Sequence, residues 1–217
     1  TLLLLFVNGK FRKFIHDAEL KWYLWSVIGF TAFIAIVLYY NSSMGVEEAF
    51  RKSLFQVASL HTSTGFATAD YMTWPSVLWG TLTVIMIIGA CAGSTTGGMK
   101  CIRLLILAKI SRNEFKHITH PNAVLPVRVN KQVISPSIRS TVLAFSFLYA
   151  VLIIVGTLAM MGMGVGLLES LGCTISSLGN MGPGLGLCGP AYSWNELPDM
   201  GKWLMSFFML LGRLELF

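Results

Sequence analysis

The chain has 217 residues, of which 54% are hydrophobic and 12% charged, and its mean hydropathy is +0.68. Soluble domains carry about 25% charged residues, so this composition excludes an ordinary soluble protein and predicts one that crosses a membrane several times. The formal net charge of +6 then reflects topology and anionic lipid headgroups. Nucleic acid is not an expected partner, because topology and lipid already account for the basic charge.

Three apolar stretches have the composition of membrane spans, which need about 20 residues. Residues 22–40 form the first, with aromatic residues at both ends suited to the interfaces. Residues 140–163 form the second, and residues 201–217 begin a third. Residues 75–110 exceed one span and are interrupted by glycines. The chain starts inside the apolar run 1–7, without the charged start of a signal peptide, so we expect a fragment of a longer protein.

Basic residues indicate the orientation of these spans. Twelve of the 16 Lys and Arg residues fall within residues 10–21 and 100–139, whereas residues 41–75 and 164–200 carry few. The positive-inside rule therefore places the first two regions in the cytoplasm and the other two outside. The segment between the first span and the glycine-interrupted one must then enter and leave the membrane from the outer side.

Residues 46–60 are predicted to form a short re-entrant helix. The segment is charged at its start and apolar afterwards, with apolar residues such as Phe50 and Leu54 at helical spacing. It is too short to span a bilayer. Residues 165–177 repeat this pattern and carry an acidic residue, Glu169, in the first half.

Each short helix is followed by a glycine-centred loop, HTSTGF at residues 61–66 and LGNMGPG at residues 178–184. A helix that ends inside the membrane directs partial negative charge at the loop behind it, which favours a cation there. Irregular backbone at that depth must be surrounded by protein or water, and glycine lets its carbonyls turn towards an ion. The alternative is a purely structural turn. His61 adjoins the first loop, and we expect it to be a hydrogen-bonded histidine of the short helix.

The glycine-rich stretch 89–98 is predicted to break a helix inside the membrane. A helix that starts near Pro75 places Gly89 about 20 Å deep, at 1.5 Å per residue, so the break must line a cavity. A phosphate-binding P-loop is rejected, because Met99 stands where that motif requires lysine. A Gly, Ser and Thr loop below the first two loops could block or release a permeation path.

Arg213 is predicted to lie near the middle of the membrane. Trp203 is a plausible interfacial anchor, and ten residues further Arg213 is about 15 Å deep. Such an arginine nearly always faces an interior cavity. It could hold the glycine loop through hydrogen bonds to loop carbonyls or act as a positive barrier. The alternative is a salt bridge to another helix; Glu215 points to a different face and is not its helical partner.

Four motifs in order carry a family resemblance: TSTGF at 62–66, GACAGSTTGGMK at 89–100, GNMGPG at 179–184 and GRLE at 212–215. Together they resemble the Trk/Ktr/HKT potassium transporters, specifically the C-terminal half of a TrkH-type bacterial uptake subunit. The resemblance implies an all-α polytopic membrane protein whose repeats of helix, re-entrant pore helix, filter loop and helix stand pseudo-fourfold around a pore.

By this resemblance the chain divides into parts of successive repeats. The expected parts are the end of the second repeat (1–8), a cytoplasmic loop (9–21), the third repeat (22–111) with the intramembrane loop 89–98, a cytoplasmic linker (112–136) and an incomplete fourth repeat (137–217). Expected filter residues, which would bind potassium, are Thr62, Ser63, Thr64, Gly65, Gly179, Asn180, Met181 and Gly182. Expected gating residues are Gly89, Gly93, Ser94, Thr95, Thr96, Gly97, Gly98 and Arg213. Since the two loops share only the glycine, backbone carbonyls are the expected ligands.

The resemblance implies potassium uptake across the bacterial inner membrane by a multi-pass protein without a cofactor. It also implies a homodimer and a cytosolic nucleotide-binding regulatory subunit, for which the basic linker is a candidate docking surface. The alternative is a proton- or sodium-coupled secondary transporter, a symporter of another small cation. An enzyme is not expected, because no nucleophile–base pair, metal-ligand cluster or carboxylate pair occurs within the spans.

Four cysteines, Cys91, Cys101, Cys173 and Cys188, show no C-x-x-C spacing, and the first three lie in or beside apolar segments. We therefore expect them to be small buried hydrophobic residues rather than members of a metal site or a disulfide.

Overall fold

The structure is a computed structural model that describes residues 16–42, 44–94, 97–120, 125–130 and 132–214. The predicted end of the second repeat, residues 1–8, lies outside these ranges. The all-α architecture expected from the sequence is confirmed. The α-helices are α3 (Ala18–Asn41), α4 (Val46–His61), α5 (Ser76–Ile87), α6 (Cys101–Thr119), α7 (Pro136–Gly162), α8 (Leu167–Gly179) and α9 (Asp199–Arg213). The shorter elements are the 3-10 turns η1 (Tyr71–Thr73), η2 (Gly186–Cys188) and η3 (Trp194–Glu196) and the strands β1 (Arg128–Val129) and β2 (Gln132–Val133).

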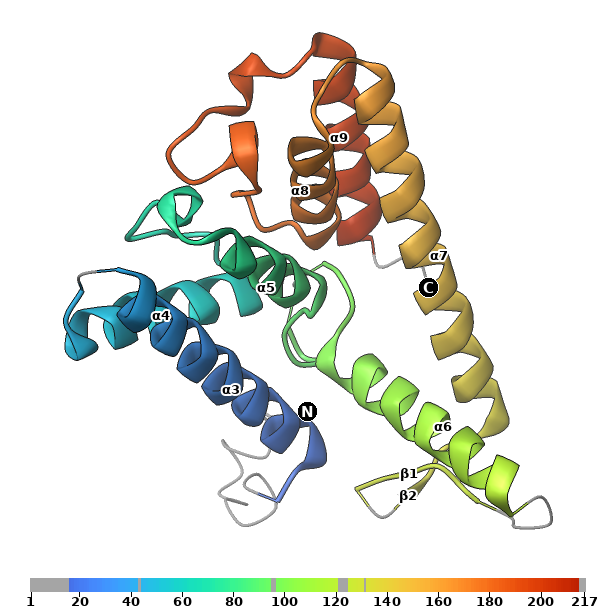
Figure 1. Ribbon diagram of the computed structural model, residues 1–217. Helices are drawn as coiled ribbons and strands as arrows, with labels where there is room; N and C mark the ends of the chain where they lie inside the picture. Colours follow the sequence, from blue (N-terminus) through green and yellow to red (C-terminus); the bar gives the residue numbers. More distant parts are fainter. Residues whose placement is uncertain (1–15, 43, 95–96, 121–124, 131, 215–217) are drawn as a thin grey trace.

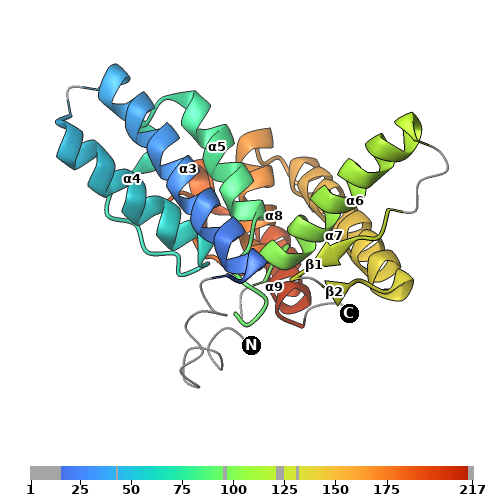
Figure 2. The ribbon, with the colours of Figure 1, turned by 90° about the horizontal axis from the view of Figure 1, so that it is seen from below.

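The helices form two groups with the same order of long helix, short helix and third helix (Figure 1). In the first group α4 packs against α3 and α5, and in the second α8 packs against α7 and α9 (Figures 1 and 2). The groups meet where α5 packs against α8. α6 then leads from the first group to the lower part of α7 (Figure 1). The short helices therefore lie at the centre of each group.

The two long helices match predicted spans. α3 contains the expected residues 22–40, and it begins where the Asp17 carboxylate accepts hydrogen bonds from two backbone N–H groups of the first turn. α7 covers nearly all of the expected residues 140–163 and begins at Pro136, whose missing N–H suits the first turn of a helix. Within the described ranges, only these two helices are both long and apolar enough to cross a bilayer.

The short helices lie close to their predicted positions. α4 ends one residue beyond the expected 46–60. α8 starts and ends two residues later than the expected 165–177. The shift has a backbone cause: Gly166 is extended, with a ψ of 158°, so the helix begins after it, and the helix continues until Asn180 ends it in the left-handed conformation.

The buried face of α4 carries polar residues beside apolar ones such as Val57 and Leu60. Ser53 and Gln56 are 0% and 1% exposed, whereas Phe50 and Leu54 of the predicted apolar stripe are 52% and 40% exposed. A soluble helix would bury the apolar stripe instead. In a membrane the apolar face can meet lipid, because lipid tails are as apolar as leucine.

The predicted break in the apolar stretch 75–110 is also present. α5 ends at Ile87 and α6 begins at Cys101. The base of the intervening loop is closed by a backbone hydrogen bond of 2.9 Å from the Gly89 N–H to the Met99 carbonyl. Thr95 and Thr96 of this loop lie outside the described residues.

The expected linker 112–136 contains regular structure. α6 extends to Thr119, because no glycine or proline precedes Pro121 to stop it. The strands β1 and β2 follow as a short antiparallel hairpin, and Asn130 between them has a φ of +49°. The cytoplasmic location of this linker stays a prediction.

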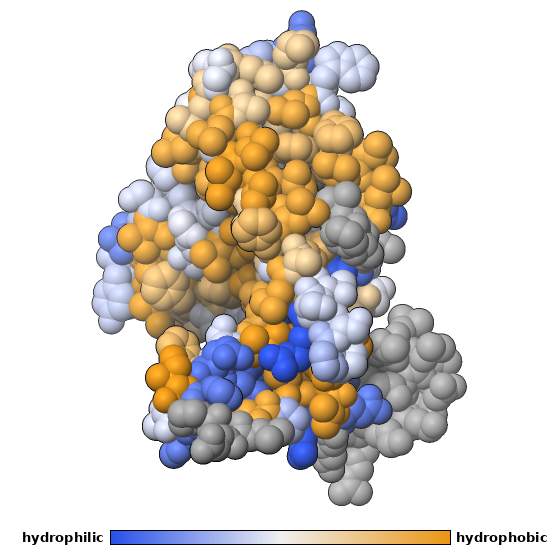
Figure 3. Space-filling model, turned by 90° about the vertical axis from the view of Figure 1, so that its right-hand side faces the viewer, coloured by the Kyte–Doolittle hydropathy of each residue, from blue (hydrophilic) through white to orange (hydrophobic). Residues whose placement is uncertain are grey.

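The exposed face of α7 is apolar along most of its length. Figure 3 shows an apolar surface over the upper and middle parts of this side of the molecule, with hydrophilic residues gathered towards its lower end. The exposed apolar residues of α7 include Ile138, Leu143, Phe147, Ile154, Val155, Leu158 and Met161. An apolar surface of this extent is typical of a face that meets lipid.

Candidate functional site

The loops that follow α4 and α8 adopt the same backbone conformation. In the first, Ser63 and Gly65 have φ angles of +53° and +79°. In the second, Asn180 and Gly182 have φ angles of +52° and +101°. Each loop thus places a left-handed residue two positions before a glycine that also has positive φ. The shared conformation explains why glycine is the residue that the two loops have in common.

Equivalent hydrogen bonds hold both loops to the ends of their helices. The Thr64 N–H donates to the Ser59 carbonyl at 2.9 Å, and the Met181 N–H donates to the Ser176 carbonyl at 3.0 Å. Each bond joins a residue to the carbonyl five positions earlier. The loops are therefore structural counterparts, although their side chains differ.

The two loops touch one another at Gly65. A Cβ atom at this position would lie 2.0 Å from the Met181 carbonyl oxygen and 3.1 Å from Pro183 Cδ. A Cβ atom at Gly182, by contrast, would have no atom of the other described residues within 4 Å. One filter glycine predicted from the sequence thus packs against the neighbouring loop, and the other borders open space.

The carbonyls of the predicted filter residues differ from those at the ends of the two loops, where Phe66 and Gly184 accept hydrogen bonds from the hydroxyls of Ser59 and Tyr71. Within the part of the chain that the structure describes, no N–H or O–H group donates to the carbonyl oxygens of the predicted filter residues. These are the carbonyls of Thr62, Ser63, Thr64, Gly65, Gly179, Asn180, Met181 and Gly182. Of these residues only Gly179 and Met181 are buried, and a row of unpaired carbonyls behind two helix C-termini can serve as ligands for a cation.

The Thr62 and Asn180 side chains form hydrogen bonds within the protein, whereas the Ser63 hydroxyl has no partner among the described residues. The Thr62 hydroxyl donates to the Ala58 carbonyl at 2.7 Å and lies 2.7 Å from the Thr64 hydroxyl. The Asn180 side-chain amide donates to the Met209 carbonyl of α9 at 3.2 Å. These contacts leave the backbone carbonyls and the Ser63 hydroxyl as the groups available to an ion.

The glycine-rich loop and α9 meet directly behind the second of these loops. A Cβ atom at Gly97 would lie 2.4 Å from the Leu178 carbonyl oxygen, and one at Gly212 would lie 2.1 Å from the same oxygen. Gly98 has a φ of +79° and lies next to the Tyr149 hydroxyl. Only glycine allows so close an approach of three backbone segments.

The other predicted gating residues are spread around this contact. Gly89 closes the base of the loop, whereas Gly93 and Ser94 form part of a turn at its tip. Arg213 is the last residue of α9 and follows Gly212 directly, so the structure places it beside the contact between the loop and α8. Glu215 lies outside the described residues.

His61 is a buried residue of α4, as expected. Its Nε2 atom lies 2.9 Å from the Ser26 hydroxyl of α3, and its ring meets the edge of Tyr23 with a centroid distance of 4.7 Å. The side chain therefore joins α4 to α3 and does not take part in the loop.

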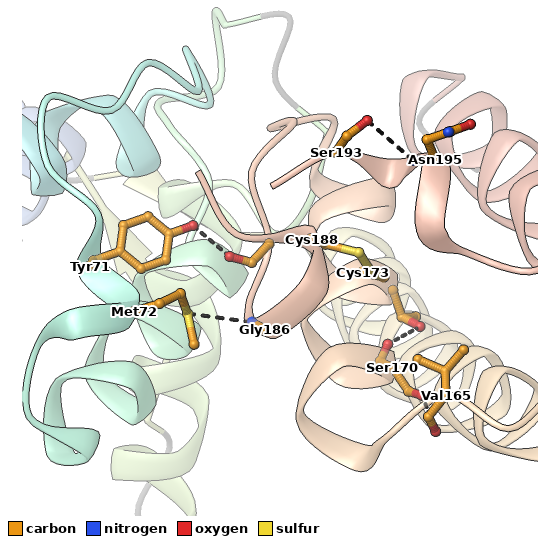
Figure 4. The surroundings of a disulfide bond; sticks show 11 residues. Tyr71, Met72, Val165, Ser170, Cys173, Gly186, Cys188, Ser193 and Asn195 are labelled. Carbon is orange, nitrogen blue, oxygen red and sulfur yellow. Dashed lines mark hydrogen bonds between the residues drawn. A yellow bond between two sulfur atoms is a disulfide. The ribbon is translucent and has the colours of Figure 1, made fainter. Parts of the chain in front are cut away.

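The expectation of unpaired thiols is wrong for two of the cysteines. Cys173 of α8 and Cys188 of η2 form a disulfide, with Cα atoms 6.0 Å apart and a sequence separation of 15 (Figure 4). The bond closes a covalent ring around the second loop. The signal that could have predicted it is topology: both residues fall in or near the outer region 164–200, where disulfides persist, whereas the free Cys91 and Cys101 do not.

Sequence reasoning also missed a link between the two groups of helices. The Tyr71 hydroxyl donates to the Gly184 carbonyl at 2.5 Å, and the Gly186 N–H donates to the Met72 sulfur at 3.4 Å (Figure 4). Burial raises the pKa of Tyr71, and the Asp70 carboxylate raises it further, so the phenol remains a proton donor. The segment η1 thereby ties the first group to the backbone beyond the second loop.

Comparison with known proteins shows one consistent family. A family model described as "TrkH: Cation transport protein" matches residues 10–217. The Trk system potassium uptake protein TrkH of Halomonas elongata is 33% identical over 215 residues, which cover 98% of this chain and 44% of that protein. The Trk system potassium uptake protein TrkG of Escherichia coli K12 is 33% identical over 218 residues, with 100% and 44% covered.

A solved structure agrees with these relatives. The crystal structure of the potassium transporter TrkH from Vibrio parahaemolyticus superposes with a TM-score of 0.85 at 33% identity. The match covers 93% of this chain and 43% of that one. The chain thus spans less than half the length of the proteins that it matches.

Proposed function

Because the chain belongs to the TrkH family of cation transport proteins, which are transporters and not enzymes, we propose that it supplies two of four filter loops of a potassium uptake protein. The observation that carries the proposal is the pair of equivalent loops with unpaired carbonyls behind α4 and α8. Potassium is the ion proposed to cross, and no cofactor takes part in the passage.

The chemistry of the filter follows from its backbone. Carbonyl oxygens replace the water shell of the ion, and the C-terminal ends of α4 and α8 add partial negative charge of about half a unit each. The filter residues in this proposal are those of the two loops, with Gly65 and Gly182 giving the turns. Because the loops differ in side chains, the four-part filter is only pseudo-symmetric, and rejection of sodium is expected to be less strict than with four identical loops.

The glycine-rich loop is proposed as the gate, together with Arg213. The close packing of Gly97 and Gly212 on one carbonyl of α8 supports this role, since the loop lies directly behind a filter loop. The remaining proposed gate residues are Gly89, Gly93, Ser94, Thr95, Thr96 and Gly98. Movement of this segment away from α8 would open the path below the filter.

The assembly and its surroundings follow from the family in the same way. We propose a multi-pass protein of the bacterial inner membrane that forms a homodimer and binds a cytosolic nucleotide-binding subunit. The cytoplasmic end of α6 is a candidate docking surface, because Arg112, Lys116 and His117 are exposed on it together with Phe115 and Ile118. Basic and apolar side chains together suit a mixed polar interface.

Rubidium uptake tests the proposed transport. Vesicles with the full chain that contains these residues should accumulate rubidium, potassium should compete for it more strongly than sodium, and uptake should persist when the proton gradient is clamped to zero. Uptake that requires the proton gradient would instead support the symporter, and equal competition by sodium would contradict potassium preference.

Replacing Arg213 with alanine should change the rate of rubidium uptake at least severalfold. The substitution would remove a positive barrier from the path or release the loop from its hydrogen bonds. Either effect raises the rubidium flux in the resting state. The variant Lys202→Ala is the control, since Lys202 pairs with Asp199 near the start of α9. An unchanged flux for Arg213→Ala would exclude both proposed roles of this residue.

A further inference from the structure

An acidic side chain of α3 accepts a hydrogen bond from the tip of the glycine-rich loop. The Glu19 Oε1 atom accepts a hydrogen bond of 2.5 Å from the Ala92 N–H, and Glu19 is only 6% exposed. From this contact we infer that Glu19 is a positioning residue that holds the loop in its observed place. Its effect on ion flow rests on the proposed function, whereas the positioning itself does not.

The same residue of the loop is held from a second side. The Lys100 Nζ atom donates to the Ala92 carbonyl at 3.5 Å. Ala92 thus has its N–H bonded to an acidic side chain and its carbonyl bonded to a basic one. Since Lys100 directly precedes α6 and Glu19 lies in α3, the two bonds fasten the loop tip to two different helices.

Glu19 is not needed to start its own helix. The Asp17 carboxylate already caps α3 by accepting bonds from the N–H groups of Glu19 and Leu20. The carboxylate of Glu19 is therefore available to the loop. A buried carboxylate is costly without partners, so the bond to Ala92 accounts for an acidic residue that the fold of α3 does not require.

The end of α3 that carries Glu19 is itself fixed in place. The Asn130 side-chain amide, between β1 and β2, donates to Asp17 Oδ2 at 2.7 Å, and the Ala18 N–H donates to Asn130 Oδ1 at 2.8 Å. Glu19 can position the loop only if the start of α3 is itself held in place. The hairpin thus supports the start of α3, and the start of α3 supports the loop.

The natural Cys91 beside Ala92 reports on this arrangement, because it is a free thiol and only partly buried. The full chain is prepared in inside-out membrane vesicles, and labelling of Cys91 by a charged maleimide is timed, with a Cys91→Ala chain as the background. Glu19→Ala should label about tenfold faster, as expected for loss of one hydrogen bond to a charged group. Glu19→Asp, whose side chain is too short, should also label faster, whereas Glu19→Gln keeps an acceptor oxygen and should label near the parent rate.

Two comparisons separate positioning from general loosening. Glu47→Ala removes an exposed glutamate of α4 that pairs with Arg51, and its labelling should equal that of the parent. The buried Cys101 should stay unlabelled in a Glu19→Ala, Cys91→Ala chain. Three results would each overturn the inference. The first is labelling of Cys101 in the Glu19→Ala, Cys91→Ala chain, and the second is equal labelling of Cys91 in Glu19→Ala and in the parent. The third is a Glu19→Gln labelling rate as fast as that of Glu19→Ala. If Glu19→Ala does not reach the membrane, the labelling rate of Cys91 in Glu19→Asp tests the inference in its place.

Rubidium uptake by the same vesicles keeps the two proposals apart. Faster labelling of Cys91 with altered uptake supports both the positioning role and the gate. Faster labelling with unchanged uptake supports the positioning role and contradicts the gate. Unchanged labelling overturns the role of Glu19 whatever the uptake.

Discussion

Replacing Gly65 with alanine is expected to reduce rubidium uptake by at least about tenfold. The residue has a φ of +79°, a conformation that costs an ordinary residue about 1–2 kcal/mol. Its Cβ atom would also lie 2.0 Å from the Met181 carbonyl oxygen, so the neighbouring loop would have to move. Because that oxygen belongs to a proposed filter ligand, both loops lose their geometry together. The measurement is initial uptake at matched protein levels in the membrane.

Two glycine variants serve as controls for this result. Gly80→Ala changes a helical glycine whose added Cβ would meet nothing within 4 Å among the described residues and should leave uptake unchanged, with a gain in stability of about 1 kcal/mol. Gly182→Ala adds strain without a clash and should lower uptake less than Gly65→Ala. Normal uptake by Gly65→Ala would contradict contact between the two loops.

Removing the disulfide is expected to lower the stability of the protein by about 3 kcal/mol, the value for a closed loop of this length. Cys188→Ser and Cys173→Ser should each produce the loss, because the bond joins α8 to the segment beyond the filter loop across 15 residues. The measurement is the temperature at which half of the purified full chain loses its monodisperse elution. Cys91→Ser, which changes a free thiol, should leave that temperature unchanged.

The bond itself can be verified separately. Thiol alkylation of the native protein without reductant should leave Cys173 and Cys188 unmodified, and both should react after reduction and unfolding. Alkylation of either residue before reduction would contradict the disulfide.

The order of the helices could be predicted from sequence because it depends on local properties. The length of two apolar stretches predicts α3 and α7, and a short stretch with charge at its start predicts α4. Glycines within an otherwise apolar stretch gave the break before α6. The two-residue shift of α8 could not be predicted, because it depends on the extended backbone of Gly166 and the left-handed one of Asn180.

The contacts between distant segments could not be predicted in this way. Glu19 and Ala92 are far apart in sequence, as are Tyr71 and Gly184, and nothing in the local pattern pairs them. The burial of Ser53 could not be predicted either, because the helical pattern of α4 places a polar residue on the exposed side. The loops themselves were found because their order in the chain repeats, whereas their equal backbone geometry is visible only in the structure.

The carbonyl of Leu178 has a consequence for how such a pore can work. Gly97 and Gly212 both pack on this one oxygen, immediately before the second of the proposed filter loops. Any displacement of the glycine-rich loop must then remove a contact that supports the loop after α8. Ion discrimination and opening would be mechanically linked, and a conducting state is expected to have a different preference between potassium and sodium from a resting one.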